Sequence, residues 1–295
     1  MSAAPRVRLP EGHDGVVLDL DGVVYRGRVA VPGAVEALAL LVEAGVRVGY
    51  ATNNAARPAS AVAAHLCELG IPTDAEQVVT SAQVAVEVVA QLIPAGASVL
   101  VVGGPGLREA VSDHGFPTVD SALALPAAVV QGFGPDTSWR DLAEATYAVS
   151  AGARWVATNT DLTVPTERGN APGNGTLVSA VAAATGKQPL VAGKPNPPLL
   201  LAAARRLGAR RALVVGDRLD TDIAGANAAG LSSVLVLSGV TVGSDLPERS
   251  DPGDAWAGRP RSTRPTFVAD DLLALVEGRW VGVDSVPSAR GHRPR

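Results

Sequence analysis

Hydrophobic and polar residues along this 295-residue chain alternate in blocks that predict short buried strands, each followed by an amphipathic helix. Residues 15–20 form an apolar run rich in branched side chains, which predicts a strand. Residues 32–44 show helical periodicity that ends at Gly45, and the apolar run 46–51 predicts the next strand. Because strands separated by helices favour parallel pairing, this part of the chain predicts a parallel α/β sheet.

The same alternation continues to residue 237, followed by an irregular stretch and a final helix, and it divides the chain into an outer and an inner part. The outer part has further predicted elements over 60–69, 81–93, 198–207, 212–215, 222–229, 233–237 and 270–277. The inner part has its own strands and helices over 98–102, 107–115, 127–131, 138–151 and 154–159. This inner alternation is long enough to form a separate α/β domain.

We therefore expect an α/β fold: a doubly wound parallel sheet of Rossmann-like type with an inserted α/β cap domain. The predicted boundaries are 1–81 and 185–280 for the two parts of the core, 82–184 for the cap, and 281–295 for a flexible tail. A basic tail could bind an acidic partner, but a solvated chain end is the simpler interpretation.

Composition and charge exclude several classes of protein. With 47% hydrophobic residues the chain can form a sizeable core, but its longest apolar stretches are interrupted by Glu36 and Glu87 and are too short for a membrane span. No apolar segment of a signal peptide follows the N-terminal residues, and the single Cys67 excludes an internal disulfide, so we expect a cytoplasmic location. A net charge of -4 and 3% aromatic residues argue against a nucleic-acid partner.

Two carboxylates, Asp19 and Asp21, stand at the end of the first predicted strand in the sequence Asp-Leu-Asp-Gly. Open α/β sheets bind ligands beyond the carboxyl ends of their strands, where one carboxylate can serve as nucleophile or metal ligand while the other transfers protons. Because Asp21-Gly22 between hydrophobic residues is also a hairpin signal, a plain turn is the alternative.

Polar residues also mark two other loops. Thr52-Asn53-Asn54 follows the second strand, where a hydroxyl and backbone N–H groups suit a phosphoryl oxygen, although an ordinary helix cap would have the same sequence. Lys194 precedes a proline and a helix, which predicts extended backbone at the entrance to a loop. A solvated surface lysine is the alternative.

Acidic residues flank a third loop, between the strand 212–215 and the next helix. Asp217 and Asp222 lie at its two ends and can converge on a hard cation, which prefers oxygen ligands. Alternatively, Asp222 serves only the helix dipole. In the inner part, Asn159 and Asp161 follow the last predicted strand and could overhang the site, with an Asx turn as the alternative.

In this order the motifs resemble those of the haloacid dehalogenase superfamily of phosphatases, matched by residues 19–22, Thr52, Lys194 and residues 216–222. The sequences Asp-Leu-Asp-Gly-Val-Val-Tyr-Arg-Gly and Thr-Asn-Asn, with a large insert between the second and third motifs, resemble its class IIA. That class includes nitrophenylphosphatases, nucleotidases, pyridoxal phosphatases and glycerol-3-phosphate phosphatases. The resemblance covers roughly residues 15–238.

The resemblance implies a role for each acidic residue. Asp19 would attack phosphorus to form a phosphoaspartate, and Asp21 would protonate the leaving oxygen and later deprotonate water. Magnesium would be held by Asp19, the backbone carbonyl of Asp21 and Asp217, with Asp222 in the same acidic shell.

For the substrate, the resemblance implies that Thr52, the backbone of Asn53 and Lys194 balance the charge on the phosphoryl oxygens. Asn54 extends this phosphate loop, and Asn159 and Asp161 are the candidate contacts from the cap.

We therefore expect a magnesium-dependent phosphatase for a small phosphate monoester, with D-glycerol 3-phosphate as the first choice. Sugar phosphates, nucleoside monophosphates and pyridoxal phosphate are the alternatives. A non-catalytic regulator that binds a phosphometabolite is the alternative of another class, and the intact Asp21 argues against it. A dehalogenase is a further alternative, although halide displacement does not need a bound cation. A homodimer is the candidate assembly.

Overall fold

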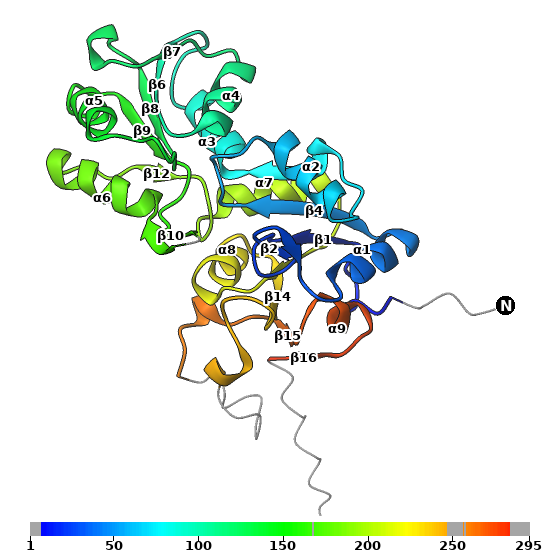
Figure 1. Ribbon diagram of the computed structural model, residues 1–295. Helices are drawn as coiled ribbons and strands as arrows, with labels where there is room; N and C mark the ends of the chain where they lie inside the picture. Colours follow the sequence, from blue (N-terminus) through cyan, green and yellow to red (C-terminus); the bar gives the residue numbers. More distant parts are fainter. Residues whose placement is uncertain (1–6, 167, 247–255, 257, 284–295) are drawn as a thin grey trace, which may run out of the picture.

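The computed structural model describes residues 7–166, 168–246, 256 and 258–283, and within them the chain forms two large parallel sheets (Figure 1). The seven-stranded sheet has the order β16 (Trp280–Gly282), β15 (Phe267–Ala269), β14 (Ser232–Val236), β13 (Ala212–Gly216), β1 (Gly15–Leu18), β4 (Arg47–Thr52) and β5 (Val78–Thr80). The five-stranded sheet has the order β12 (Leu190–Val191), β9 (Arg154–Ala157), β8 (Ala128–Gln131), β6 (Val99–Val102) and β7 (Thr118–Val119). Only β15 and β16 pair antiparallel in these sheets.

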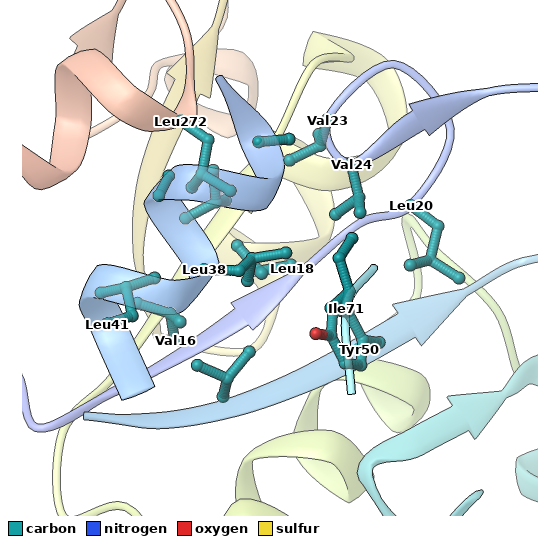
Figure 2. Packing of buried hydrophobic residues seen from close by; sticks show 14 of the residues in the cluster. Val16, Leu18, Leu20, Val23, Val24, Leu38, Leu41, Tyr50, Ile71 and Leu272 are labelled. Atoms are coloured by element: carbon teal, nitrogen blue, oxygen red, sulfur yellow. The ribbon is translucent and has the colours of Figure 1, made fainter. Parts of the chain in front are cut away.

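Helices cover both faces of the seven-stranded sheet, as its hydrophobic strands require. One face packs against α1 (Ala34–Glu43), α2 (Ala59–Glu68) and α9 (Leu272–Val276). The other packs against α3 (Ser81–Ala90), α7 (Pro197–Leu207) and α8 (Ala224–Ala228). Strand β1 shows why both faces are covered: Val16 and Leu18 point toward the α1 side (Figure 2). Val17 between them packs in the cluster on the α7 side.

The five-stranded sheet is covered in the same way and shares part of its core with the first sheet. Helices α5 (Trp139–Ser150) and α6 (Asn174–Thr185) pack on one of its faces. Helices α3 and α4 (Pro105–Asp113) pack on the other. Because α3 contacts both sheets, a single apolar cluster runs from the core into the inserted domain.

Except for α6, a helix of 12 residues that the sequence analysis did not predict, the helices and longer strands agree with the predictions to within a few residues, whereas the short elements were not predicted. These are the strands of two or three residues and the antiparallel hairpins β2 (Tyr25–Arg26)–β3 (Val29–Ala30) and β10 (Thr163–Thr166)–β11 (Gly169–Pro172). Such elements are too short for a period of hydrophobicity to appear. The helix expected over 222–229 begins earlier, as the π-helical turn η3 (Leu219–Ile223).

The domain boundaries stay predictions, although two strands cross them. Strand β12 lies beyond residue 184 and pairs with β9, so the second sheet extends past the predicted end of the cap. Strand β16 occupies the beginning of the predicted tail, and residues 284–295 of that tail lie outside the described residues. Among the described residues, no helix has the length and hydrophobicity to cross a bilayer.

The contact between the two domains at Gly106 gives a stability test. Gly106 N–H donates to the Ala56 carbonyl at 3.0 Å, and a Cβ at position 106 would lie 2.6 Å from the Arg57 carbonyl carbon and 2.8 Å from Pro58 N. Because these are backbone atoms, we expect Gly106→Ala to lower the free energy of unfolding by about 1–3 kcal/mol in urea denaturation. Gly258→Ala, where the methyl meets nothing within 4 Å, is the control, with an expected change within about 0.5 kcal/mol. Equal effects of the two substitutions would contradict this reading of the contact.

Candidate active site

The polar residues singled out in the sequence meet at the carboxyl edge of the seven-stranded sheet. Asp19 follows β1, Thr52 ends β4 and Asp217 follows β13, and these three strands are neighbours. Asp19 N–H donates to the Val215 carbonyl at 2.9 Å, so the strand ladder fixes its backbone. Lys194 reaches the same edge from the loop between β12 and α7.

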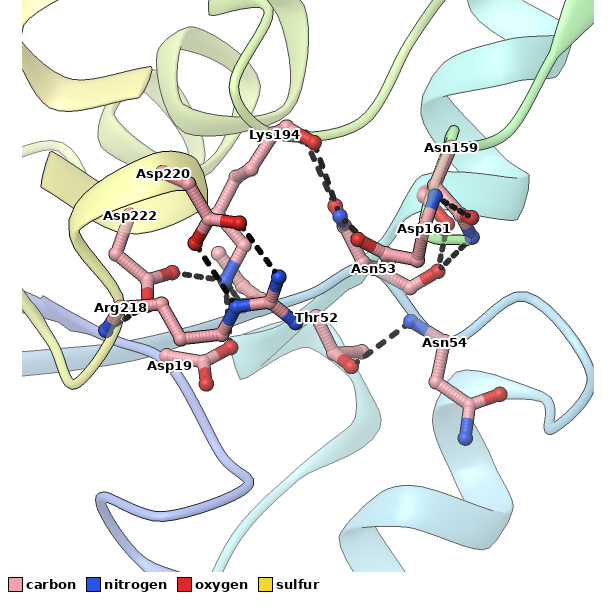
Figure 3. A network of polar contacts seen from close by, with 12 residues as sticks. Asp19, Thr52, Asn53, Asn54, Asn159, Asp161, Lys194, Arg218, Asp220 and Asp222 are labelled. Atoms are coloured by element: carbon pink, nitrogen blue, oxygen red, sulfur yellow. Dashed lines mark hydrogen bonds and ion pairs between the residues drawn. The ribbon is translucent and has the colours of Figure 1, made fainter. Parts of the chain in front are cut away.

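Lys194 is the central cation of the site and lies beside Asp19 and Asp222 (Figure 3). Its side chain is buried. Its Nζ lies 2.5 Å from Asp19 Oδ1 and 2.6 Å from Asp222 Oδ1, and it donates to the Ala51 carbonyl at 3.2 Å. Charge-assisted hydrogen bonds of this length are the stronger kind in proteins. The alternative of a solvated surface lysine is therefore wrong.

Three carboxylates surround this lysine and form a cluster suited to a cation. Asp19, Asp217 and Asp222 each offer an oxygen, and these oxygens lie within 4.8 Å of one another. Asp217 Oδ2 accepts the Val240 N–H at 2.5 Å, and Asp222 Oδ2 accepts the Arg218 N–H at 3.1 Å. Asp217 Oδ1 is buried and has no hydrogen-bond partner among the described residues.

The electrostatics of the cluster show an excess of negative charge. Burial and the neighbouring Asp222 raise the pKa of Asp217 to about 6. Burial likewise raises the pKa of Asp19 well above its usual range, although the Lys194 charge opposes the shift. Burial alone would lower the pKa of Lys194, but Asp19 and Asp222 outweigh it and raise that pKa.

The donor set fits a divalent cation with a preference for oxygen ligands. Three carboxylates and one ammonium leave a charge of -2, which such an ion balances, and the unpartnered Asp217 Oδ1 points to a missing ligand. Close packing leaves the carboxylates little room to move away. A Cβ added at Gly22 or Gly239 would overlap Asp217, and one added at Gly216 would overlap Asp222.

Asp21 lies beside the cluster and leads into a turn at residues 22–24, but the β2–β3 hairpin turns at residues 27–28, so Asp21-Gly22 is not the hairpin turn that its sequence signals. Gly22 adopts a φ of +84° and its N–H donates to the Tyr25 carbonyl at 2.8 Å. Asp21 keeps much of its surface exposed, yet the surrounding protein desolvates the carboxyl enough to raise its pKa, against the Gly27 N–H and the Lys194 charge. A raised pKa favours the protonated form that a general acid needs.

The Thr52-Asn53-Asn54 segment forms a tight turn above the cluster. Thr52 is buried, and its Oγ1 accepts the Asn54 N–H at 3.1 Å. Asn54 is exposed, and its Oδ1 accepts the Ala56 N–H at 2.9 Å in an Asx turn. The helix cap given as the alternative is not formed, because α2 begins at Ala59 with Pro58 as its N-cap, and phosphate contacts by these residues stay a prediction.

Asn53, Asn159 and Asp161 lie together where the inserted domain meets the core. Asn53 Nδ2 donates to Asp161 Oδ2 at 3.1 Å, and Asn159 Nδ2 donates to the Asn53 carbonyl at 2.7 Å. Asn159 Oδ1 accepts the Asp161 N–H at 3.1 Å, which is the Asx turn considered as the alternative. These side chains have protein partners, and their contact with a substrate stays a prediction.

Sequence reasoning missed Arg218, which lies in the same network (Figure 3). Its Nε and one terminal nitrogen donate to the two oxygens of Asp220 at 3.0 and 2.8 Å. This bidentate pair raises the pKa of Arg218, to which the Asp161 charge from the inserted domain contributes. The sequence Arg218-Leu219-Asp220, with opposite charges separated by one residue, could have indicated this ion pair.

Comparison with known proteins identifies the class to which the chain belongs. Residues 16–117 match the model of the haloacid dehalogenase-like hydrolases, and residues 191–275 match a related model of the same kind. The chain belongs to the haloacid dehalogenase-like hydrolases.

Among individual relatives, D-glycerol 3-phosphate phosphatase of Mycobacterium tuberculosis is 48% identical over 90% of this chain and 72% of its own length. An acid sugar phosphatase of Staphylococcus saprophyticus is 34% identical over 90% of this chain and 98% of its own length. A solved structure of the mycobacterial glycerol phosphate phosphatase in complex with magnesium superposes with a TM-score of 0.83 and 47% identity. It matches 92% of this chain and 79% of that one.

The raised pKa of Asp217 predicts that the metal-free protein loses stability as the pH rises. Between its ordinary value of 3.8 and about 6, the native state keeps a proton that the unfolded state has released, so Asp217 destabilises the fold as pH rises through this range. We therefore expect the free energy of unfolding of Asp217→Asn, measured in urea with a chelator, to increase relative to that of the wild type by up to about 3 kcal/mol between pH 4 and pH 7. A difference in stability that is the same at both pH values would show that the Asp217 pKa is not raised.

Proposed function

We propose that this chain is a magnesium-dependent phosphatase that hydrolyses a small phosphate monoester, D-glycerol 3-phosphate, through a phosphoaspartate on Asp19. The observation that carries the proposal is the contact of Asp19 with Lys194 inside the carboxylate cluster. A nucleophilic carboxylate, a neighbouring cation and a set of metal ligands are the parts that phosphoryl transfer needs. The 48% identity to D-glycerol 3-phosphate phosphatase supports the choice of substrate.

In the first step, an oxygen of Asp19 attacks phosphorus and the bond from phosphorus to the ester oxygen breaks. Asp21 donates its proton to that oxygen, so the product leaves as an alcohol. In the second step, water attacks phosphorus, Asp21 takes the proton of the water, and the bond from phosphorus to Asp19 breaks. Inorganic phosphate leaves and both carboxyl groups return to their starting states.

The remaining residues of the site balance charge. Lys194 and the Thr52 hydroxyl would contact the phosphoryl oxygens, where negative charge is concentrated in the transition state. Magnesium would be held by Asp19, Asp217 and the Asp21 carbonyl, with Asp222 beside them. When bound, it reduces the repulsion between a carboxylate nucleophile and a dianionic phosphate.

The same site would accept other monoesters, because the residues at the sheet edge face only the phosphoryl group and the metal. Sugar phosphates are the second candidate, since one relative is an acid sugar phosphatase. A non-catalytic regulator would have no use for the acid Asp21, and a stable phosphoaspartate without turnover would favour it. The homodimer, the cytoplasmic location and the lack of a nucleic-acid partner stay predictions of the sequence.

The nucleophile gives the first test of this function. We expect Asp19→Asn to abolish turnover and covalent labelling by phosphate, because the amide is nearly isosteric but cannot attack phosphorus. Circular dichroism checks the fold, and mass spectrometry excludes deamidation. Asp14→Asn, at the opposite end of β1, is the matched control and should keep wild-type activity. Substantial steady-state hydrolysis by pure Asp19→Asn protein would eliminate the covalent mechanism.

Metal and substrate are tested together by a panel of phosphate monoesters with and without magnesium. We expect D-glycerol 3-phosphate to have the highest kcat/KM among glycerol, sugar, nucleoside and pyridoxal phosphates. A chelator should stop hydrolysis and magnesium should restore it, whereas calcium should support turnover poorly because its coordination is larger and looser.

Asp217→Ala should raise the magnesium concentration needed for half-maximal activity and reduce the increase in Tm that magnesium gives to the wild type. Full activity in excess chelator would refute the metal requirement. A higher kcat/KM for another monoester would change the proposed substrate but not the proposed mechanism.

A further inference from the structure

We propose that Asn53 is a positioning residue that makes the placement of Lys194 depend on the docking of the inserted domain through Asp161. The inference rests on the proposed phosphatase function and adds to it a physical link between the inserted domain and the central cation. It assigns the Asn53 side chain to Lys194 and Asp161, rather than to the substrate.

The Asn53 side chain forms hydrogen bonds with both the N–H and the carbonyl of Lys194. Asn53 Oδ1 accepts the Lys194 N–H at 2.8 Å, and Asn53 Nδ2 donates to the Lys194 carbonyl at 3.0 Å. The pair of contacts fixes both the position and the direction of the Lys194 backbone. Since the Nζ of this residue contacts Asp19 and Asp222 at 2.5 and 2.6 Å, a shift of the backbone would disturb both contacts.

The remaining N–H of the Asn53 amide is used by the inserted domain. Asn53 Nδ2 donates to Asp161 Oδ2 at 3.1 Å. The amide oxygen and both N–H groups of the Asn53 side chain therefore have partners. Asp161 lies in the loop after β9, and this loop is held by Asn159, whose carbonyl accepts from Asn174 Nδ2 at the start of α6. Asp161 therefore adds a third contact that fixes the orientation of the amide bound to Lys194 (Figure 3).

The Lys194 loop has little space in which to adjust. A Cβ at Gly193 would lie 2.6 Å from Asn53 Oδ1 and would also overlap the Thr158 carbonyl of the inserted domain. Ala192 N–H donates to the Ala157 carbonyl at 3.0 Å, which ties the loop to β9. The Lys194 backbone is thus held between Asn53 of the core and the end of β9, and the inserted domain contacts Asn53 and supplies β9.

A double-mutant cycle tests the link with p-nitrophenyl phosphate, which has no polyol for Asp161 to contact. We expect Asn53→Ala and Asp161→Ala each to lower kcat and kcat/KM together by about tenfold to a hundredfold, as loss of an interaction made in the transition state does. If Asp161 acts through Asn53, Asn53→Ala with Asp161→Ala should be no slower than Asn53→Ala alone. Losses that multiply in the double variant would overturn the proposal.

Exchanging the amide and the carboxylate between positions 53 and 161 gives a sharper test. Asn53→Asp keeps the acceptor for the Lys194 N–H but places carboxylate oxygen against both Asp161 and the Lys194 carbonyl, so we expect a larger loss of kcat than for Asp161→Asn. Combining Asn53→Asp with Asp161→Asn restores a donor and an acceptor between positions 53 and 161 but not the donor to the Lys194 carbonyl, so it should recover part of the lost kcat. No recovery in this double variant would count against the link.

Hydrogen exchange provides a readout that does not depend on phosphatase activity. We expect Asp161→Ala to accelerate deuterium exchange of the Lys194 amide at least tenfold, although Asp161 does not contact that amide. Asn227→Ala is the matched control, because Asn227 Nδ2 donates to the carbonyls of Arg261, Ser262 and Arg264 away from the site. It should lower Tm and leave both kcat and Lys194 exchange unchanged.

Unchanged Lys194 exchange in folded Asp161→Ala protein would refute the link whatever the enzyme hydrolyses. Conversely, faster exchange in a protein that hydrolyses no phosphate monoester would support the link and refute the proposed function.

Discussion

Repulsion among three carboxylates at one end of a parallel sheet is the constraint on which the rest of this structure depends. Asp19 follows β1, whereas Asp217 and Asp222 both come from the segment after β13, and the sheet holds their oxygens within 4.8 Å of one another. One buried ammonium, that of Lys194, offsets part of this charge. Such a cluster needs rigid supports, because carboxylates free to move would separate or take up protons. The strand ladder, the glycine packing and the Asn53 amide are those supports.

Much of this arrangement could be predicted from the sequence, because it depends on local patterns. The apolar runs gave the strands, and polar residues at the ends of those runs gave Asp19, Thr52 and Asp217, since parallel strands place their carboxyl ends at one edge. The burial of Lys194 could not be derived from its surroundings in sequence. It depends on a loop that leaves the second sheet and contacts the first.

The contacts that complete the site come from segments without a recognisable pattern. Val240, whose N–H binds Asp217, lies in a loop after β14 with no polar motif of its own. The partners of Asn53 are equally hidden, because Lys194 and Asp161 are far from it in sequence and each belongs to a different connection. Strands of two or three residues escape prediction for the simpler reason that two residues cannot display an alternation.

The position of α3 limits how this architecture can change. One side of the helix packs on β5 and α7 of the core, and the other packs on α4, β8 and β9 of the inserted domain. The inserted domain is therefore not a module that could be exchanged as a unit with that of a relative, since its removal would take away the apolar contacts of α3 with α4, β8 and β9. New substrate preferences in such a chain are more readily acquired by altering loops, such as the one after β9, than by recombining whole domains.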